Sequence, residues 1–286
     1  MKKDTAILLV YCPDKPGIVH QITGFIHRYG GNILYLDQHA DHEEKNFFMR
    51  VEWELEDFTV PADELEERAR KEIIEPLDMQ YQLYFSSNKP RMAVFASRHA
   101  HCLADILHRY STGEWQVDIP LVISNHEDMR RTVENHGIPY HCLPVNRENK
   151  AEQEARELEL LAANNVEFIV LARYMQILSA EFVSNYPNRI INIHHSFLPA
   201  FPGSNPYRSA AARGVKIIGA TSHYVTSDLD AGPIIEQGIT RVSHRDTVED
   251  MVRKGRDVER VVLAKSVYLH LNRKILVLNN RTVVFE

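Results

Sequence analysis

The chain has 286 residues, a formal net charge of −6, and apolar and charged fractions of 44% and 25%. Such a composition is typical of globular proteins long enough for two domains, and it excludes the disordered and fibrous classes. The acidic balance argues against nucleic acid as a partner, because that binding depends on Lys and Arg. Three scattered cysteines without CxxC spacing, Cys12, Cys102 and Cys142, favour a reducing compartment, and we expect the cytoplasm. No stretch approaches the ~20 apolar residues that a membrane span needs.

The N-terminal part of the chain alternates strand and helix patterns in the order β-α-β-β-α-β. Residues 14–17 (Asp-Lys-Pro-Gly) predict a turn that opens an amphipathic helix, and Gly30-Gly31 ends that helix. This order of elements predicts a compact ferredoxin-like domain. The expected strands are 5–11, 32–40, 47–55 and 79–85, with one helix starting at residue 18 and another over 61–74.

A short polar segment closed by a proline, Ser86–Pro90, is typical of a linker. We therefore expect a first domain over residues 1–86, a linker over 87–90 and a second domain over 91–286. Alternating strands and helices in the second domain predict a Rossmann-like, mostly parallel sheet flanked by helices. The expected strands are 91–96, 116–124, 166–171, 189–193, 215–225 and 233–241, with helices over 150–163 and 247–270 and a short final hairpin.

Polar residues follow apolar ones in the stretch 190–196 (IINIHHS), at the expected carboxyl end of a buried strand. Parallel-sheet enzymes place their chemistry at such ends. Because successive side chains of a strand face opposite ways, Asn192 and His194 share one face and His195 points to the other. We therefore expect only one of the paired histidines to reach a site.

A second polar cluster, residues 223–233, contains Asp228 and Asp230 before a Gly-Pro turn. Attack of water on a carbonyl carbon needs a donor for the developing oxyanion, a group that moves protons and a carboxylate that orients it. Asn192, His194 and Asp230 supply these three functions. The residue types alone are weak evidence in a sequence with 15 histidines.

The sequence of residues 192–237 closely resembles the catalytic segment of the folate-dependent formyltransferase superfamily. It reads NIHHSFLPAFPGSNPYRSAAARGVKIIGATSHYVTSDLDAGPIIEQ. Upstream, LARYMQILS resembles the superfamily's folate-pocket segment. Within the superfamily, the resemblance is closest to the formyltetrahydrofolate deformylases, and it covers essentially the whole chain. It implies that Asn192 donates to the formyl oxygen, that His194 shuttles protons, and that Asp230, directly before Ala-Gly-Pro, orients His194 and the attacking water.

The same resemblance implies a set of substrate-binding residues. The apolar side chains among them are equally consistent with core packing, and His223 either steadies Asp230 or completes the polar end of its strand. The second aspartate, Asp228, is expected to shape the loop. The expected substrate-binding residues are Met175, Ile177, Leu178, Ser196, His223, Val225 and Asp228.

The sequence also distinguishes a hydrolase from a transferase. A glycinamide-ribonucleotide formyltransferase should follow the first strand of its catalytic domain with a glycine-rich turn, whose bare N–H groups hold the phosphate of the acceptor. This chain has Ser97–Cys102 (SRHAHC) there, and only a short segment follows the last long helix, which argues against a tRNA substrate. We expect hydrolysis of 10-formyltetrahydrofolate by water to tetrahydrofolate and formate, which supplies formate for purine synthesis. The alternative is transfer of the formyl group to a small amine.

Other chemistries fit the sequence less well. Residues His194, His223, Asp228 and Asp230 would suit zinc, but no HExxH or CxxC spacing accompanies them, and we expect no metal. No strand is followed by GxGxxG, which argues against a nicotinamide enzyme. We expect no cofactor, because the folate is a substrate. A buried thiol usually behaves as a small hydrophobe, so Cys102 is not expected to be a nucleophile.

Residues 11–33 (YCPDKPGIVHQITGFIHRYGGNI) resemble an ACT domain. The resemblance implies a pairing module, so we expect a homo-oligomer, and it leaves open whether a small amino acid binds as an effector. The expected effector site comprises Asp14, Gly17, Gly30 and Asn32. The remaining alternative is an amino-acid sensor with a vestigial catalytic domain.

Overall fold

A computed structural model describes residues 4–199 and 206–286. The chain divides into two compact units. The first comprises the residues up to Lys89 with 273–276 and 283–286, and the second comprises 90–272 and 277–282. No helix in the described part of the chain is both long enough and apolar enough to cross a membrane.

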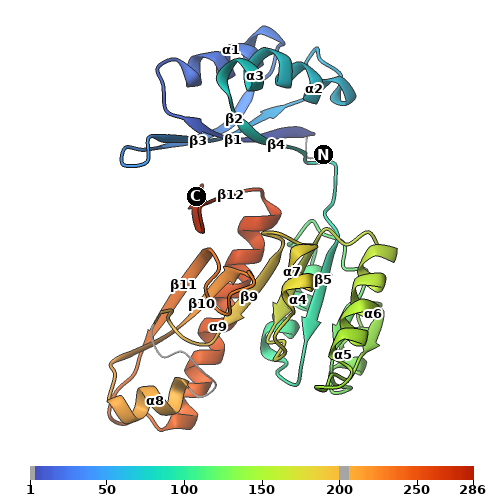
Figure 1. Ribbon diagram of the computed structural model, residues 1–286, viewed down its shortest axis with the longest axis vertical. Helices are drawn as coiled ribbons and strands as arrows, with labels where there is room; N and C mark the ends of the chain where they lie inside the picture. The colour runs from blue at the N-terminus through green and yellow to red at the C-terminus, as the bar shows by residue number, and fades with distance from the viewer. Residues whose placement is uncertain (1–3, 200–205) are drawn as a thin grey trace. The chain divides into compact units, whose positions relative to one another are not determined.

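The first unit is a four-stranded antiparallel sheet with its helices on one face (Figure 1). The strand order is β2-β3-β1-β4, as the predicted ferredoxin-like pattern requires, and this fold class is confirmed. Side chains on one face of the sheet, such as Leu8 and Trp53, pack against Ile22 and Phe25 of the first helix. The elements are β1 (Thr5–Pro13), α1 (Ile18–Arg28), β2 (Ile33–Asp41), β3 (Asn46–Glu54), α2 (Ala62–Ala69), a π-helix (Arg70–Ile74), α3 (Glu75–Leu77) and β4 (Gln80–Phe85).

The C-terminal segments of the first unit correct the expectation that all residues after 90 belong to the second domain. The guanidinium Nε of Arg50 donates to the carbonyl oxygen of Arg273 (3.0 Å), and the Tyr35 hydroxyl donates to the carbonyl oxygen of Glu286 (2.7 Å). These side chains lie on neighbouring strands of the sheet. Sequence patterns do not reveal such contacts, because more than 200 positions separate the partners.

The second unit is built on a seven-stranded sheet of order β11-β10-β9-β8-β5-β6-β7. The pairings from β9 to β7 are parallel, and β10 and β11 add two antiparallel strands at one edge, so the predicted mostly parallel sheet is confirmed. The elements are β5 (Met92–Ala96), α4 (His101–Ser111), β6 (Val122–Ser124), α5 (Arg130–Glu134), β7 (Tyr140–Cys142), α6 (Lys150–Ala163), β8 (Phe168–Ala172), α7 (Ala180–Ser184), β9 (Ile190–His194), α8 (Pro206–Arg213), β10 (Ile217–Tyr224), β11 (Ile234–Arg241) and α9 (Val248–Leu271), followed by the hairpin β12 (Ile275–Leu278) and β13 (Arg281–Val284).

One predicted strand of the second unit, 116–124, is shorter than expected. Only Val122–Ser124 pairs as β6, and Asp118 forms an isolated bridge to Arg91. The physical reason is Pro120, which lies between these pairings and has no N–H for a sheet ladder.

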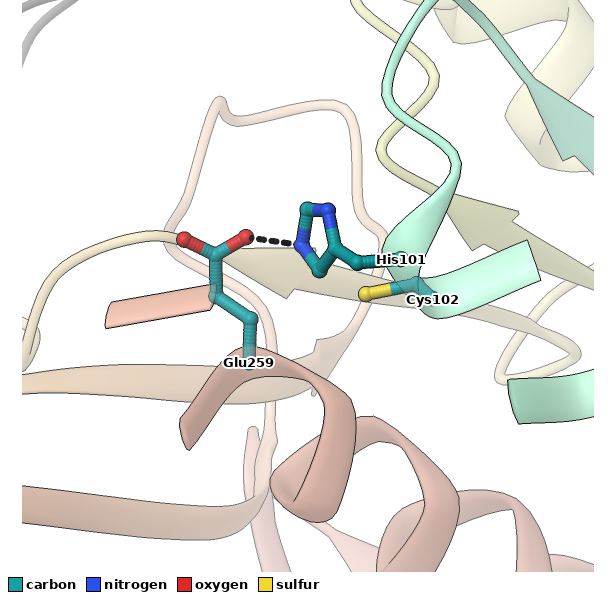
Figure 2. Close-up of side chains that lie close together, drawn as sticks. All are labelled: His101, Cys102 and Glu259. Carbon is teal, nitrogen blue, oxygen red and sulfur yellow. Dashed lines mark hydrogen bonds and ion pairs between the residues drawn. The ribbon is translucent and has the colours of Figure 1, made fainter. Parts of the chain in front are cut away.

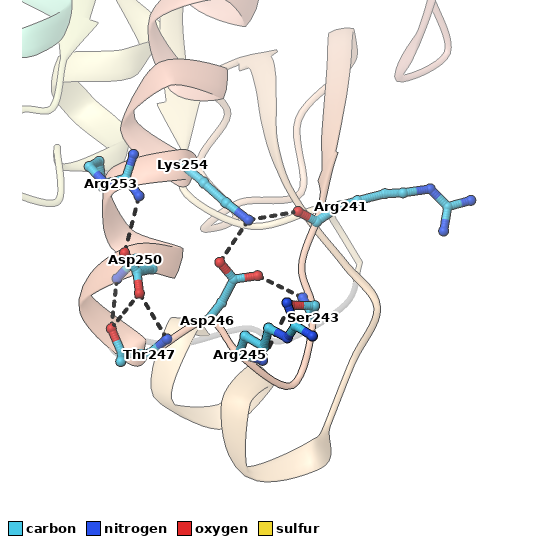
Figure 3. A network of polar contacts seen from close by, with 8 residues as sticks. All are labelled: Arg241, Ser243, Arg245, Asp246, Thr247, Asp250, Arg253 and Lys254. Atoms are coloured by element: carbon cyan, nitrogen blue, oxygen red, sulfur yellow. Dashed lines mark hydrogen bonds and ion pairs between the residues drawn. The ribbon is translucent and has the colours of Figure 1, made fainter.

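The long helix α9 begins at a network of polar contacts (Figure 3). Thr247 and Asp250 form a capping box, in which each side chain accepts from the backbone N–H of the other residue. The Lys254 ammonium contacts the carboxylate of Asp246 (2.8 Å), and the same carboxylate accepts from the backbone N–H of Ser243 (2.7 Å). These contacts fix the start of α9 next to the end of β11. They thereby also fix the position of the α9 residues that lie near the candidate active site described below.

Candidate active site

A cleft of about 420 Å³ lies at the carboxyl ends of β8 and β9. The lining residues come from three chain segments: the end of β8 with the loop after it (171–178), the end of β9 (192–195), and the end of β10 with the loop after it (223–230). The cleft brings together Asn192, His194 and Asp230 with His223 and Asp228. Sites of parallel sheets occur at such carboxyl edges, where strands end and loops begin.

Asn192 and His223 are direct cross-strand partners in the antiparallel pair β9 and β10. The Asn192 amide nitrogen lies 3.2 Å from Nε2 of His223. Nδ1 of His223 lies 2.9 Å from the carbonyl oxygen of Tyr224, which can only accept, so Nδ1 carries the hydrogen. In the uncharged ring Nε2 then accepts from Asn192, and the second N–H of the amide remains free to donate into the cleft.

His194 and Asp230 lie in direct contact in the cleft, with 3.2 Å between Nδ1 and Oδ1. His223 approaches the same carboxylate oxygen at 3.7 Å. The hydrogen bond from His194, and after it the contact with the His223 imidazole, holds the pKa of Asp230 well below its usual range, although burial opposes the shift. Asp230 is therefore an anion that keeps the hydrogen of His194 on Nδ1. Nε2 of His194 is buried and has no hydrogen-bond partner among the described residues.

The backbone of the loop after β10 presents the Asp230 carboxylate. Asp230 has a positive φ of 54°, which is a left-handed conformation that costs a β-carbon-bearing residue about 1 kcal/mol and that Asp and Asn tolerate best. A side chain at Gly232 would place its Cβ 1.8 Å from the carbonyl oxygen of Tyr224, so only glycine fits there. The backbone N–H of Tyr224 donates to Pro233 (2.9 Å) and closes the loop.

Most residues expected to bind substrate lie around this cleft. Met175 and Ile177 are half or more exposed, which is unusual for large apolar side chains, and with Leu178 and Val225 they offer an apolar wall for a flat ring. The exposed Asp228 also lines the cleft. Ser196 does not line the cleft, and lines instead a separate apolar pocket of about 160 Å³ with Phe197 and Ile218.

His195 corrects the expectation that only one of the paired histidines reaches the site. Both line the cleft, and their ring centroids lie 5.2 Å apart. The alternation of strand side chains does not extend to His195, because β9 ends at His194. Burial, and after it the charge of Arg173, lowers the pKa of His195 to about 4, so its imidazole is uncharged near neutral pH.

A second polar cluster, not foreseen from the sequence, lies next to the cleft around the buried carboxylate of Glu259. Glu259 accepts from the Tyr207 hydroxyl (2.8 Å), contacts Nε2 of His101 (2.8 Å) and forms an ion pair with Arg173 (3.3 Å). Although burial opposes it, the hydrogen bond from His101 and the charge of Arg173 keep the pKa of Glu259 below its usual value. Arg173 has a positive φ of 62°. Strained backbone of this kind is concentrated at functional sites.

Within the described residues, one group has ligand atoms close enough together to hold a metal ion, and it is not the predicted set. It comprises His101, Cys102 and Glu259 (Figure 2), whose ligand atoms lie within 4.8 Å of one another. Burial raises the pKa of the Cys102 thiol, which disfavours the thiolate that a metal binds. The Arg173 guanidinium already neutralises Glu259, so a cation would have to displace it.

The four expected effector residues lie at the two ends of α1. Asp14 and Gly17 precede the helix, and Gly30 and Asn32 follow it. The helix has 11 residues, so about 16 Å separates its ends, and one small amino acid cannot touch both pairs in one chain. Asn32 is engaged with the carboxylate of Glu54 at 3.0 Å.

The buried carboxylate of Glu157 contacts a residue that lines the cleft. Oε1 of Glu157, on α6, accepts from the hydroxyl of Tyr174 (2.9 Å), and Tyr174 lines the cleft. Burial raises the pKa of Glu157 to about 7 from an ordinary value of 4.5. Near neutral pH this residue therefore exchanges between a neutral and a charged form inside the core of the unit.

Comparisons with known proteins agree with the fold. Residues 90–267 match the family model "Formyl transferase", and residues 6–76 match "ACT domain". A chain from Symbiobacterium toebii, glycinamide ribonucleotide transformylase 1, is 30% identical with a TM-score of 0.66, and the match covers 72% of this chain and 98% of that one. The protein therefore belongs to the formyltransferase family and carries an ACT domain before the catalytic unit.

Relatives that match over the full chain identify a smaller family within the formyltransferases. A formyltetrahydrofolate deformylase from Synechocystis is 55% identical over 285 residues and covers 100% of both chains. One from Bacillus subtilis is 48% identical, with 99% of this chain and 95% of the relative covered. A crystal structure of a formyltetrahydrofolate deformylase from Pseudomonas syringae has a TM-score of 0.97 at 46% identity and covers 100% of this chain and 95% of that one. The chain belongs to the formyltetrahydrofolate deformylase family.

The two aspartates of the loop give a matched pair of substitutions. We expect Asp230→Asn to lower kcat about 10³-fold, because an amide no longer holds His194 in its reactive tautomer. Asparagine tolerates positive φ, so circular dichroism and melting should stay close to those of the parent protein. Asp228→Asn should change kcat by less than about twofold, because that side chain is exposed and screened. Equal losses in both variants would contradict the assignment of Asp230.

Glu157→Gln tests the buried carboxylate through the pH dependence of stability. Between pH 4.5 and 7 the folded state binds more protons at Glu157 than the unfolded state, so this group's contribution is complete at low pH and is lost as the pH rises through 7. Relative to the parent, the variant should gain about 3 kcal/mol of unfolding free energy between pH 5 and 8.5.

This gain can be measured by urea unfolding that follows Trp115 fluorescence in a Trp53→Phe background, so that the signal comes from the second unit. A difference between variant and parent that stays constant from pH 5 to pH 8.5 would contradict the raised pKa.

Proposed function

We propose that this protein hydrolyses 10-formyltetrahydrofolate to tetrahydrofolate and formate, with Asn192, His194 and Asp230 as catalytic residues. The observation that carries the proposal is the buried, unpartnered Nε2 of His194, on a ring whose Nδ1 faces an ionised Asp230. A base held in one tautomer beside an apolar wall is the arrangement that water attack on a bound formyl group requires.

Each step of the reaction has a group to perform it. The free N–H of the Asn192 amide donates to the formyl oxygen and stabilises the oxyanion of the tetrahedral intermediate, together with His194. Nε2 of His194 takes a proton from the attacking water while Asp230 stabilises the imidazolium. The protonated His194 then donates that proton to N10 of the folate as the C–N bond breaks. Formate leaves as a carboxylate, and its proton passes to solvent.

The loop after β5 supports water rather than an amine as the acceptor. Instead of a glycine turn, residues 97–101 include side chains that contact residues in and beside the cleft. Ser97 donates to Asn125 (2.6 Å) and accepts from the backbone N–H of Met175 (3.1 Å), while His101 contacts Glu259. The loop therefore lacks the glycines whose bare backbone N–H groups would hold the phosphate of an acceptor.

The wider role follows from the products. We propose that the reaction runs in the cytoplasm without a cofactor, returns formate for purine synthesis and restores free tetrahydrofolate. The first unit serves as a pairing module of a homo-oligomer, and a small amino acid is its candidate effector. Leu34 and Leu36 on the edge strand β2 are exposed, as a surface for pairing requires.

The proposal is tested by incubating the purified protein with 10-formyltetrahydrofolate alone, and with glycinamide ribonucleotide added. We expect one formate for each tetrahydrofolate formed, at a rate that the ribonucleotide does not change. In water enriched in ¹⁸O, the formate should carry one oxygen from solvent. A rate that depends on the amine, with formyl recovered on it, would show that the protein is a transferase. An Asn192→Ala variant, which lacks the oxyanion donor, should lose about 10²- to 10³-fold in kcat.

A further inference from the structure

A second cavity of about 350 Å³ shares two side chains, Arg173 and His195, with the catalytic cleft. Its walls come from the loop after β5, from α8 and from α9. The function proposed above makes no use of it. Its lining is rich in cationic and imidazole side chains: His99, His101, Arg173, His195, Arg208 and Arg256, with Glu259 as the one carboxylate and Tyr207, Val248 and Val252 completing it.

The charges of this cavity are unevenly distributed. At its inner wall, Glu259 is satisfied by Arg173, His101 and Tyr207, so that part is close to neutral. Figure 2 shows the contact between His101 on α4 and Glu259 on α9. By contrast, Arg208 and Arg256 are exposed, and neither forms an ion pair within the parts of the chain that the structure describes. The cavity therefore has a polar, neutral interior and a positively charged outer part.

Tyr207, which lines this cavity, packs closely against the α9 helix. Gly255 lies one residue before Arg256, and a Cβ there would sit 2.0 Å from the hydroxyl oxygen of Tyr207. That hydroxyl is the donor to Glu259. Glycine in the middle of a helix costs about 1 kcal/mol relative to alanine, so the close packing of Tyr207 on α9 is maintained against a propensity cost.

We propose that this cavity is a binding site for a small carboxylate, and that it receives the formate produced in the neighbouring cleft. The inference rests on the proposed hydrolysis, which turns a neutral amide and water into a monoanion next to His194. Guanidinium groups bind carboxylates by charge and by paired hydrogen bonds, and unpaired Arg208 and Arg256 are available for both. Because Glu259 is already neutralised at the inner wall, the positive charge open to a ligand lies at Arg208 and Arg256, which suits a small monoanion.

The test is product inhibition of the full-length protein by sodium formate, at an ionic strength held constant with sodium chloride. In Arg256→Gln, the inhibition constant for formate should rise about three- to tenfold, while KM for 10-formyltetrahydrofolate stays within about twofold. Arg208→Gln should shift it in the same direction. Arg253→Gln is the matched control, because Arg253 lies on the same helix, is exposed and does not line the cavity.

Three outcomes would overturn the inference. An inhibition constant that is the same in all four proteins would show that formate does not use this cavity. Inhibition by inorganic phosphate that is stronger than inhibition by formate, and that Arg256→Gln abolishes, would make it a phosphate site. A rise in KM for the folate that matches the rise for formate would place Arg256 at the substrate.

A direct measurement keeps this inference separate from the proposed reaction. Line broadening of ¹³C-formate by the protein without folate should be weaker in Arg256→Gln than in Arg253→Gln. If the parent protein broadens formate in this way but releases none from 10-formyltetrahydrofolate, the site stands and the hydrolase fails. If the protein releases formate from 10-formyltetrahydrofolate but Arg256→Gln and Arg253→Gln broaden ¹³C-formate equally, the hydrolase stands and the formate site is excluded.

Discussion

The contact between Asp230 and His194 is the interaction on which the remaining features of the site depend. It fixes a hydrogen on Nδ1 of His194 and leaves Nε2 as a buried lone pair beside the cleft. The fold maintains it from two sides. The final residue of a buried strand carries the imidazole, and a closed loop at positive φ carries the carboxylate. Gly232 is required because the loop passes too close to the carbonyl oxygen of Tyr224 for any side chain. The positive φ of Asp230, the end of β9 at His194 and the close packing at Gly232 thus all hold the carboxylate against the imidazole.

The antiparallel addition of β10 to a parallel sheet explains why the imidazole of His223 lies in the site. Register places His223 directly opposite Asn192, and the backbone carbonyl of Tyr224 sets its tautomer. His223 then contacts the Asn192 amide and lies 3.7 Å from the Asp230 carboxylate. Hydrogen bonds that hold a reacting side chain in place restrict its motion. Groups that are already in place lower the activation barrier, because they need not reorganise during the reaction.

Sequence reasoning foresaw the elements more fully than the site. The choice of Asn192 and His194 follows from strand alternation, because β9 is regular up to His194. The same rule was wrong for His195, since the strand has ended there. Periodicity could not reveal Arg173 and Glu259, because 86 positions separate them and the packing of α9 alone brings them together. The choice of Asp230 over Asp228 depended on resemblance, because a loop has no period from which the direction of a carboxylate can be calculated.

In the proposed reaction Asp230 acts through His194, and a double-mutant cycle measures this coupling most directly. The kcat of formate release is compared in the parent, in Asp230→Asn, in His194→Gln and in the double variant. If the two residues act as one unit, the double variant should lose no more activity than His194→Gln alone, so that the individual losses do not multiply. Losses that multiply in full would show that Asp230 and His194 contribute independently, and would contradict the account.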